Sequence, residues 1–349
     1  MNTYLILQHP GHNRVYYNLS GTLALAELQI ASTRLSGPSS NIEIVDIKGI
    51  RYLSLTTKSE VSEQDLELLS RLSFVFALFK LEKTGDTPHL VPIFKKEYEY
   101  IDSKISSLLK YAGKTNELFT KMMINVALLS SNFSFKDNIQ LLDPVAGKGT
   151  TLYEGAIYGF DVTGIEIDPK SAQAIKIYFK KYIETERYKY SLETKQVFGK
   201  NKSNAIYGDM FKYALSKEAF KTESGQKKLQ IITGTSLNAS SYVKNNHYHL
   251  IVGDLPYGVA HGNSLNKKSN SITRNPSELL DQSLPEWFKV LKKGGVVVIA
   301  WNAFVISRNK LTEIFIKNGF DVITESPYNE FEHLVDRSIK RDIIVARKV

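Results

Sequence analysis

The chain has 349 residues, of which 42% are hydrophobic and 23% charged, so it is long enough for two domains and has the composition of a globular protein. Lys and Arg outnumber Asp and Glu by 45 to 36, and the resulting net charge of +9 favours a polyanionic partner such as nucleic acid, although many basic enzymes have none. The absence of cysteine excludes disulfides, thiolate zinc sites, iron–sulfur clusters and a cysteine nucleophile.

The first ten residues have no basic stretch ahead of their apolar run, which is not the pattern of a signal peptide. The apolar run at 295–301 is far shorter than the roughly 20 residues that cross a bilayer. We therefore expect a cytoplasmic protein with no membrane partner. The sequence leaves the oligomeric state open.

Residues 1–110 carry the patterns of a small α+β domain. Period-two alternation predicts strands at 4–8, 42–55, 74–81 and 90–94, and helical periodicity predicts helices at 22–35 and 62–72. The order β-α-β followed by α-β-β resembles a ferredoxin-like layer. Nothing in this segment looks catalytic, so we interpret it as an accessory domain.

From residue 111 onward, strands and helices alternate, which predicts a parallel sheet with helical crossovers. The expected strands are 139–142, 162–167, 205–207, 250–252, 296–301, 321–324 and 342–347. The expected helices are 116–129, 151–158, 171–184 and 311–318. Segments 186–204 and 216–245 are rich in Lys, Ser and Asn and are interpreted as insertions.

The first of these strands runs into a glycine turn. Asp143 ends the strand, and Gly147 and Gly149 follow before the next helix. Two glycines let the backbone lie flat against a ligand where a Cβ would collide, and an acidic strand end suits a ligand with an ammonium group. Taken alone, Gly-x-Gly is weak, because plain tight turns share it. It is not a P-loop, since the Gly-Lys-Ser/Thr spacing is absent.

The next two predicted strands also end in carboxylates. Glu166 is placed to accept hydrogen bonds from two ribose hydroxyls, whereas Asp168 is expected to cap the following helix. Asp209 could accept from an adenine amino group, with Met210 against the ring, or could simply cap a helix. Three carboxylates at three successive strand ends are harder to explain by chance than any one of them.

The motif Asp-Leu-Pro-Tyr-Gly at 254–258 follows the fourth strand of this series. An exocyclic amine on a base is a poor nucleophile, because its lone pair is delocalised into the ring. Hydrogen bonds to Asp254 and to the carbonyl of Leu255 would localise that pair, and Asp254 could take the released proton. Tyr257 offers a stacking face worth roughly 1–3 kcal/mol. The candidate residues for this step are Asp254, Leu255, Pro256 and Tyr257. An ordinary β-turn is the alternative.

Other candidates are weaker. His247 and His249 lie two residues apart without a third ligand, so we expect no metal. The loop at 259–275 contains Lys267, Lys268 and Arg274 and could close over a phosphate backbone, but a solvated loop explains it equally well.

Together, the motifs at 143–151, 164–169, 208–210 and 254–258 resemble those of class I S-adenosylmethionine-dependent methyltransferases, and more narrowly those of the branch that methylates exocyclic amines of bases. Asp-Leu-Pro-Tyr-Gly is similar to the motif of tRNA guanine-N2 methyltransferases with a THUMP-type RNA-binding region. The runs at 114–117, 333–338 and 21–28 look like those of the same group. The resemblance implies a Rossmann-like α/β fold with a seven-stranded sheet in the order 3-2-1-4-5-7-6, and a smaller ferredoxin-like or THUMP-like α+β domain.

The resemblance also implies roles for the strand-end residues. S-adenosyl-L-methionine would be held by Asp143, Gly147 and Gly149 at its methionine part, by Glu166 at ribose and by Asp209 at adenine, with 254–257 around the acceptor. Lys148 stands where a small polar residue is common. The expected partner is RNA, with a guanine amine of tRNA as the acceptor.

Three alternatives share this framework. A DNA adenine-N6 methyltransferase has the same cofactor features, but its motif usually has two prolines after the first residue, and Leu255 breaks that pattern. A methyltransferase acting on a protein glutamine would gain nothing from a basic surface. A nucleic-acid-binding protein that has lost activity is a different class, and the intact acidic and glycine positions argue against it.

Overall fold

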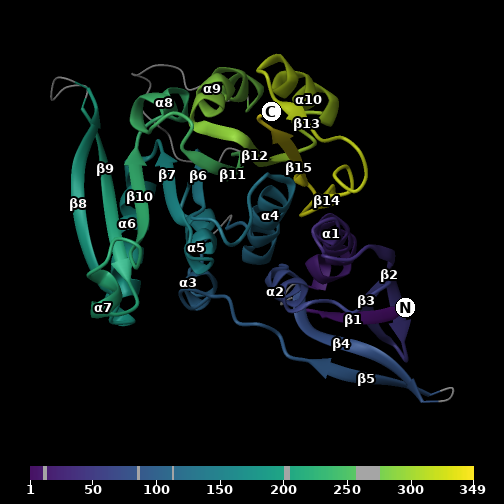
Figure 1. The fold of residues 1–349 in the computed structure, drawn as a ribbon. Coiled ribbons are helices and arrows are strands. Elements are labelled where there is room, and N and C mark those ends of the chain that lie inside the picture. The colour runs from purple at the N-terminus through teal and green to yellow at the C-terminus, as the bar shows by residue number, and fades with distance from the viewer. Residues whose placement is uncertain (11–13, 85–86, 112–113, 200–204, 257–275) are drawn as a thin grey trace.

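The computed structural model describes residues 1–10, 14–84, 87–111, 114–199, 205–256 and 276–349. Two separate β-sheets organise the chain, one of five strands and one of ten (Figure 1). Within the described residues, no helix is long and apolar enough to cross a membrane.

The smaller sheet belongs to the N-terminal segment. Its strands in spatial order are β2 (Ser39–Ile47), β3 (Ile50–Thr57), β1 (Asn2–Gln8), β4 (Val75–Thr84) and β5 (Thr87–Ile93), all antiparallel. Helices α1 (Arg14–Ser32) and α2 (Glu63–Arg71) complete it. The order 2-3-1-4 with β-α-β-β-α-β connectivity is ferredoxin-like, as predicted, with β5 added at one edge. A capping box starts α2, in which Ser62 and Asp65 each accept from the other's backbone N–H.

The larger sheet carries the second pattern. Its strands in spatial order are β13 (Asp321–Val322), β15 (Lys340–Arg347), β12 (Leu291–Asn302), β11 (Tyr248–Asp254), β6 (Gln140–Asp143), β7 (Asp161–Glu166), β10 (Lys227–Thr233), β9 (Ile206–Ala214) and β8 (Lys189–Phe198), and β14 (His333–Leu334) pairs with β15. From β10 to β12 the neighbours are parallel, and β15 is antiparallel to β12. From β10 to β13 the order is 3-2-1-4-5-7-6, which confirms the predicted sheet.

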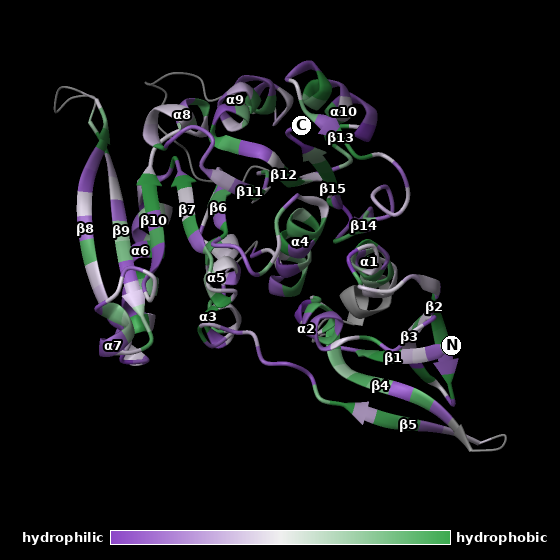
Figure 2. Cartoon of the chain, viewed as in Figure 1, coloured by the Kyte–Doolittle hydropathy of each residue, from purple (hydrophilic) through white to green (hydrophobic). Residues whose placement is uncertain are grey.

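Helices cover both faces of this sheet. They are α3 (Lys104–Ser107), α4 (Glu117–Ser130), α5 (Thr150–Ile157), α6 (Pro169–Thr185), α7 (Lys217–Phe220), the 3-10 turn η2 (Ser236–Asn238), α8 (Ala239–Tyr242), α9 (Pro276–Val290) and α10 (Arg308–Lys317). Leu141 packs in the cluster with α4, α5 and α6, whereas its neighbour Leu142 packs in the cluster with α9 and α10. Strands buried on both faces read as continuous apolar runs, which explains why β6 and β11 were found in the sequence. In Figure 2, α4 is hydrophobic over much of its length, while β8 at the outer edge is mainly polar with short hydrophobic bands.

One strand assignment from the sequence is wrong. The third parallel strand is β10, which pairs with β7 through Ile231 opposite Gly164, and not the segment at 205–207. That segment opens β9, which is antiparallel to β10 and forms a hairpin with β8 along the outer edge (Figure 1). The segment at 216–245, interpreted as an insertion, therefore contains a core strand. Apolar alternation is similar in β9 and β10, so it does not tell an edge hairpin from a parallel strand.

Buried polar groups join the two units. Glu27 on α1 is fully buried and accepts from Asn125 Nδ2 on α4 at 2.7 Å and from the Ser73 N–H at 3.0 Å. Tyr158 donates to the Asn125 side-chain oxygen at 2.6 Å. Burial raises the pKa of Glu27, and these hydrogen bonds oppose the rise. The units are thus fixed to each other by specific donors and acceptors as well as by apolar packing.

The segment before α4 already packs on the larger unit. The Tyr100 N–H donates to the Ile157 carbonyl at 2.7 Å, and the hydroxyl of Tyr178 donates to the Ile105 carbonyl at 2.6 Å. The sequence suggested a boundary at 110. We propose that the second domain begins near Tyr100, because the chain there contacts α5 and α6.

Candidate functional site

Three carboxylates lie along one edge of the larger sheet. Asp254, Asp143 and Glu166 end β11, β6 and β7, which are adjacent and parallel. The side chain of Asp143 is buried, and burial raises its pKa to about 7, with the charges of Glu166 and Asp254 acting in the same direction. The structure therefore brings together the first, second and fourth predicted strand ends.

The glycine turn after β6 has the backbone that its sequence requires. Gly147 and Gly149 have φ of +53° and +89°, a backbone region that residues other than glycine rarely adopt. A Cβ on Gly149 would lie 3.1 Å from the ring of Tyr153 and 3.2 Å from Ile175. The Val145 N–H donates to Asp143 Oδ1 at 3.0 Å, so the turn also holds the buried acid.

Glu166 connects this turn to the next one. Its carboxylate accepts from the Gly147 N–H at 2.7 Å and from the Asp168 N–H at 2.8 Å, while burial raises its pKa. Asp168 caps α6 by accepting from the N–H groups of Lys170 and Ser171, as predicted. The next apolar side chain, Ile167, is 49% exposed beside Glu166.

Asp209 does not stand at the end of a parallel strand. It lies within β9 opposite Ile231, and its Oδ1 accepts from Lys176 Nζ at 2.8 Å and from the hydroxyl of Thr194. The prediction placed it beside the cofactor only because β9 was mistaken for the third strand. The residue that ends that strand is Thr233, followed by Gly234, whose N–H donates to the Glu166 carbonyl at 2.9 Å. The segment Leu-Gln-Ile-Ile at 229–232, with three apolar residues before Thr-Gly-Thr, was the signal that could have found this loop.

Asp254 is contacted from two distant parts of the chain. The hydroxyl of Thr115 donates to Asp254 Oδ2 at 2.5 Å, and Arg341 Nη2 lies 3.6 Å from the same oxygen. Leu255 is buried, and its N–H donates to the Ala300 carbonyl at 2.9 Å, whereas Pro256 is exposed. Tyr257 and the basic loop at 259–275 lie outside the described residues.

The segment before α4 also contributes a residue near the carboxylates, Tyr111. The hydroxyl of Tyr111 lies 3.0 Å from the Thr150 hydroxyl, and Lys148 Nζ lies 4.6 Å from the Tyr111 ring centroid. Burial raises the pKa of Tyr111, and the charges of Asp143 and Asp254 add to the rise. Sequence analysis assigned no role to Tyr111, Thr115 or Arg341. The run at 114–117 pointed to Thr115 only by its resemblance to a family pattern.

His249 has a structural role in the larger sheet. Its Nδ1 accepts from the Gln140 N–H at 2.8 Å, and burial lowers its pKa to about 4. In the part of the chain that the structure describes, no group of three or more His, Asp or Glu side chains is arranged to hold a metal ion.

Residues 121–326 match the family model UPF0020, described as an RMKL-like methyltransferase domain. The match covers more than half of the chain. The chain belongs to this methyltransferase family. It is an S-adenosylmethionine-dependent methyltransferase with a Rossmann-like α/β sheet, and S-adenosylmethionine is its cofactor. No curated protein sequence matches it significantly.

Solved structures resemble the chain only distantly. TrmN from Thermus thermophilus aligns over 100% of both chains with 11% identity and a TM-score of 0.45. A TehB-like S-adenosylmethionine-dependent methyltransferase from Corynebacterium glutamicum aligns over 61% of this chain and 81% of its own, with 14% identity and a TM-score of 0.34. An rRNA methylase from Streptococcus thermophilus aligns over 61% and 88%, with 10% identity and a TM-score of 0.34. At these values the likeness carries no functional argument.

Proposed function

We propose that this methyltransferase acts on RNA, and that its acceptor is an exocyclic base amine, most specifically N2 of a guanine in tRNA. One observation carries the proposal. Asp254, the first residue of Asp-Leu-Pro-Tyr-Gly, ends β11 beside the edge formed by Asp143 and Glu166. A hydrogen-bond acceptor for an amine thus lies next to the acids suited to the cofactor.

The residues at this edge fit S-adenosylmethionine. Asp143 would pair with its ammonium group, and the turn leaves space at Gly147, where a Cβ would have a backbone oxygen 4.0 Å away as its nearest neighbour. Glu166, oriented by two backbone N–H groups, would accept from the ribose hydroxyls. Adenine would contact the exposed Ile167 and the backbone after Thr233, which replaces Asp209 in this role.

The chemistry needs an amine whose lone pair points at the methyl group. When bound, the cofactor supplies an electrophilic methyl on its sulfonium. Asp254 and the Leu255 carbonyl would accept the two amine hydrogens and localise the lone pair on nitrogen. The amine nitrogen would take the methyl group as its C–S bond breaks, and Asp254, directly or through water, would accept the released proton. Tyr257 would stack on the extruded base.

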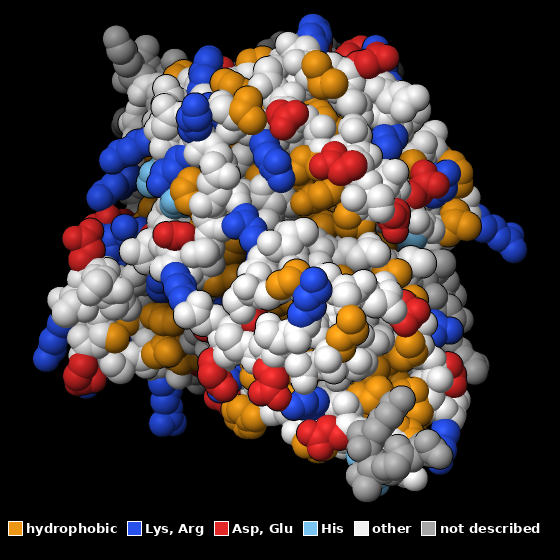
Figure 3. Space-filling model, turned by 45° about the vertical axis from the view of Figure 1, so that its right-hand side comes forward, with side chains coloured by type: hydrophobic (Ala, Val, Ile, Leu, Met, Phe, Trp, Pro, Cys, Tyr) orange, Lys and Arg blue, Asp and Glu red, His pale blue; other side chains and the backbone are white. Residues whose placement is uncertain are grey.

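A nucleic acid as the substrate is supported by charge. The net charge of +9 attracts a polyanion over long range. Figure 3 shows Lys and Arg side chains spread over one face with Asp and Glu among them, so on that face the positive charge is distributed and not gathered into one patch. This distribution favours general attraction of a phosphate backbone followed by selection at the site.

The test is transfer of tritiated methyl groups to bulk tRNA, rRNA and DNA, followed by mass spectrometry of the nucleosides. We expect N2-methylguanosine from tRNA. Asp254→Ala should bind the cofactor normally but lose a factor on the order of 10²–10⁴ in transfer. The matched control is Asp46→Asn, an exposed carboxylate on β2 of the other sheet, which should not change the rate. Label in DNA or protein instead of RNA, or a near-normal rate for Asp254→Ala, would refute the proposal.

A further inference from the structure

Two side chains from distant elements hold the same oxygen of Asp254. Thr115, just before α4, donates to Oδ2 at 2.5 Å, and Arg341, on β15, brings a guanidinium nitrogen to 3.6 Å from it. Arg341 is 6% exposed, and its guanidinium lies over the ring of the fully buried Phe119 at 4.9 Å. The cation is therefore fixed by packing as well as by charge.

The Arg341–Asp254 pair differs from a surface ion pair because aromatic side chains surround Arg341. His333 is the cross-strand partner of Arg341, and its ring lies 5.3 Å from that of Phe119. Burial and the nearby Arg341 lower the pKa of His333, which favours its neutral form beside the guanidinium. Titratable groups near Asp254 include Arg341 from β15, Asp143 from β6 and Tyr111 from the segment before α4.

We propose that Arg341 is a positioning residue that, together with Thr115, keeps Asp254 ionised and oriented toward the acceptor amine. The inference rests on the proposed role of Asp254. A protonated carboxyl would offer a donor to the amine and would lose the pull on its hydrogens. A guanidinium stays charged over the working pH range, so it favours the carboxylate in a site that also contains Asp143 and Glu166. Thr115, as a donor, fixes the carboxylate plane without adding charge.

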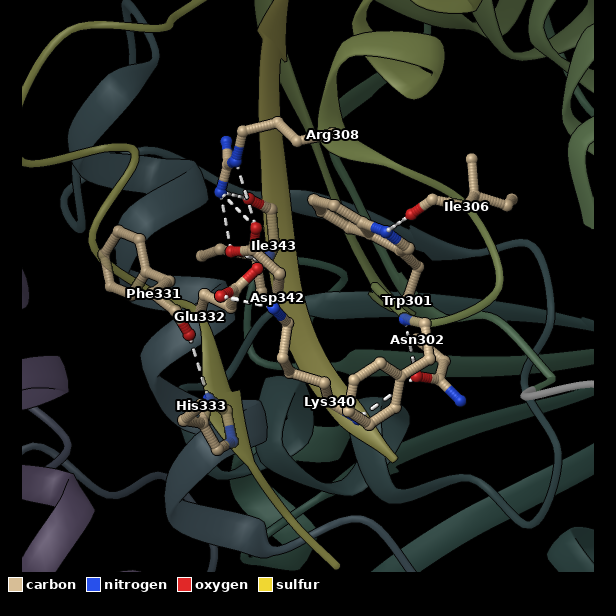
Figure 4. Close-up of polar contacts among 11 residues, drawn as sticks. Trp301, Asn302, Ile306, Arg308, Phe331, Glu332, His333, Lys340, Asp342 and Ile343 are labelled. Atoms are coloured by element: carbon tan, nitrogen blue, oxygen red, sulfur yellow. Dashed lines mark hydrogen bonds and ion pairs between the residues drawn. The ribbon is translucent and has the colours of Figure 1, made fainter. Parts of the chain in front are cut away.

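The next residue on β15 supplies a matched control. Successive side chains on a strand point to opposite faces, and Asp342 forms an ion pair with Arg308 from α10, with nitrogen–oxygen distances of 3.0 and 2.6 Å (Figure 4). This second Arg–Asp pair joins a partly exposed arginine to a buried acid on the same strand and does not involve Asp254. A variant at Arg308 therefore reports what loss of the cation beside a buried carboxylate does to folding alone.

The experiment compares Arg341→Gln, Arg341→Lys, Thr115→Val and Arg308→Gln. The measured quantities are kcat against pH at saturating cofactor and RNA, and the cofactor dissociation constant. Because removing a cation disfavours the carboxylate, the acidic limb of kcat should move to higher pH in Arg341→Gln and by less in Arg341→Lys. Thr115→Val should lower kcat, and cofactor affinity should stay unchanged in all three. Arg308→Gln should keep the wild-type limb while losing thermal stability.

A second measurement does not depend on activity. NMR of protein labelled at aspartate carboxyl carbons, with the Asp254 signal assigned through Asp254→Asn, follows the titration directly in wild type and Arg341→Lys as well as in Arg341→Gln. The inference would be overturned if Asp254 titrated over the same pH range in the wild type and the variants. It would also be overturned if the variants lost cofactor affinity by the same factor as kcat. Methyl transfer by the wild type to DNA and not RNA would refute the proposed function alone, since the Asp254 titration would still decide the role of Arg341.

Discussion

Alanine substitutions at the two glycines of the turn after β6 can be compared directly with each other. Gly147 and Gly149 both have positive φ, so alanine at either position forces a left-handed backbone. Their surroundings differ. A Cβ on Gly147 would have its nearest neighbour, a backbone oxygen, at 4.0 Å, whereas one on Gly149 would lie 3.1 Å from Tyr153 and 3.2 Å from Ile175. Comparing the two variants separates backbone strain from steric overlap.

The difference in unfolding free energy follows from these distances. The left-handed conformation costs about 1–2 kcal/mol in both variants. Tyr153 and Ile175 are fully buried and must shift by a few tenths of an ångström to admit the methyl group, so overpacking adds about 1–3 kcal/mol in Gly149→Ala only. Gly149→Ala should therefore be clearly the less stable of the two, although it adds the same single methyl group.

Urea unfolding of the cofactor-free variants measures this difference. Trp287 and Trp301 are buried in the core of the larger unit, so their fluorescence reports its unfolding. Calorimetry with S-adenosylmethionine would show weaker binding in both variants, because each distorts the turn. Equal losses of stability, or a smaller loss in Gly149→Ala, would refute the reasoning from Cβ distances.

Two further predictions concern buried acids. Burial raises the pKa of Asp143 to about 7 from an ordinary 3.8, so its protonation stabilises the cofactor-free fold at low pH, and that stabilisation is lost as pH rises through this interval. Asp143→Asn should thus be more stable than wild type above pH 7 in urea unfolding without cofactor. It should also bind the cofactor more weakly, with an affinity that no longer increases with pH. A variant whose stability and cofactor affinity depend on pH as in the wild type would contradict this. Glu27→Ala removes the acceptor shared by Ser73 and Asn125 and should cost about 1–3 kcal/mol of unfolding free energy without changing cofactor affinity, whereas an unchanged urea midpoint would contradict the role of the buried network.

The strand ends that the sequence predicted correctly have a purely local signature. Asp143, Glu166 and Asp254 each follow a short apolar run and precede a turn, and a buried parallel strand imposes that pattern wherever it occurs. Their meeting at one edge follows from parallel topology alone. Helix α9 escaped prediction because Pro285 lies inside it, and an interior proline normally argues against a helix.

The parts that the sequence did not predict depend on contacts between distant segments. Asp209 has the local pattern of a strand-end acid, but the β8–β9 hairpin precedes β10 in the chain while lying outside it in the sheet. Thr115 and Arg341 have no periodicity that marks them, because their role is defined only where the segment before α4 and strand β15 meet the end of β11. Such residues become visible only in three dimensions.

The charges at the sheet edge suggest how one site can treat two carboxylates differently. Burial raises the pKa of Asp143, and the charges of Glu166 and Asp254 act in the same direction, so a bound cation would favour its ionised form. Asp254 has a cation beside it within the protein, since Arg341 approaches from β15 with its guanidinium over the ring of Phe119. The acid facing the cofactor would thus respond to the cofactor's ammonium group, while the acid facing the acceptor has Arg341 beside it whether or not a ligand is bound. The ammonium group of the cofactor would then form an ion pair with Asp143 and leave Asp254 as an acceptor for the amine hydrogens.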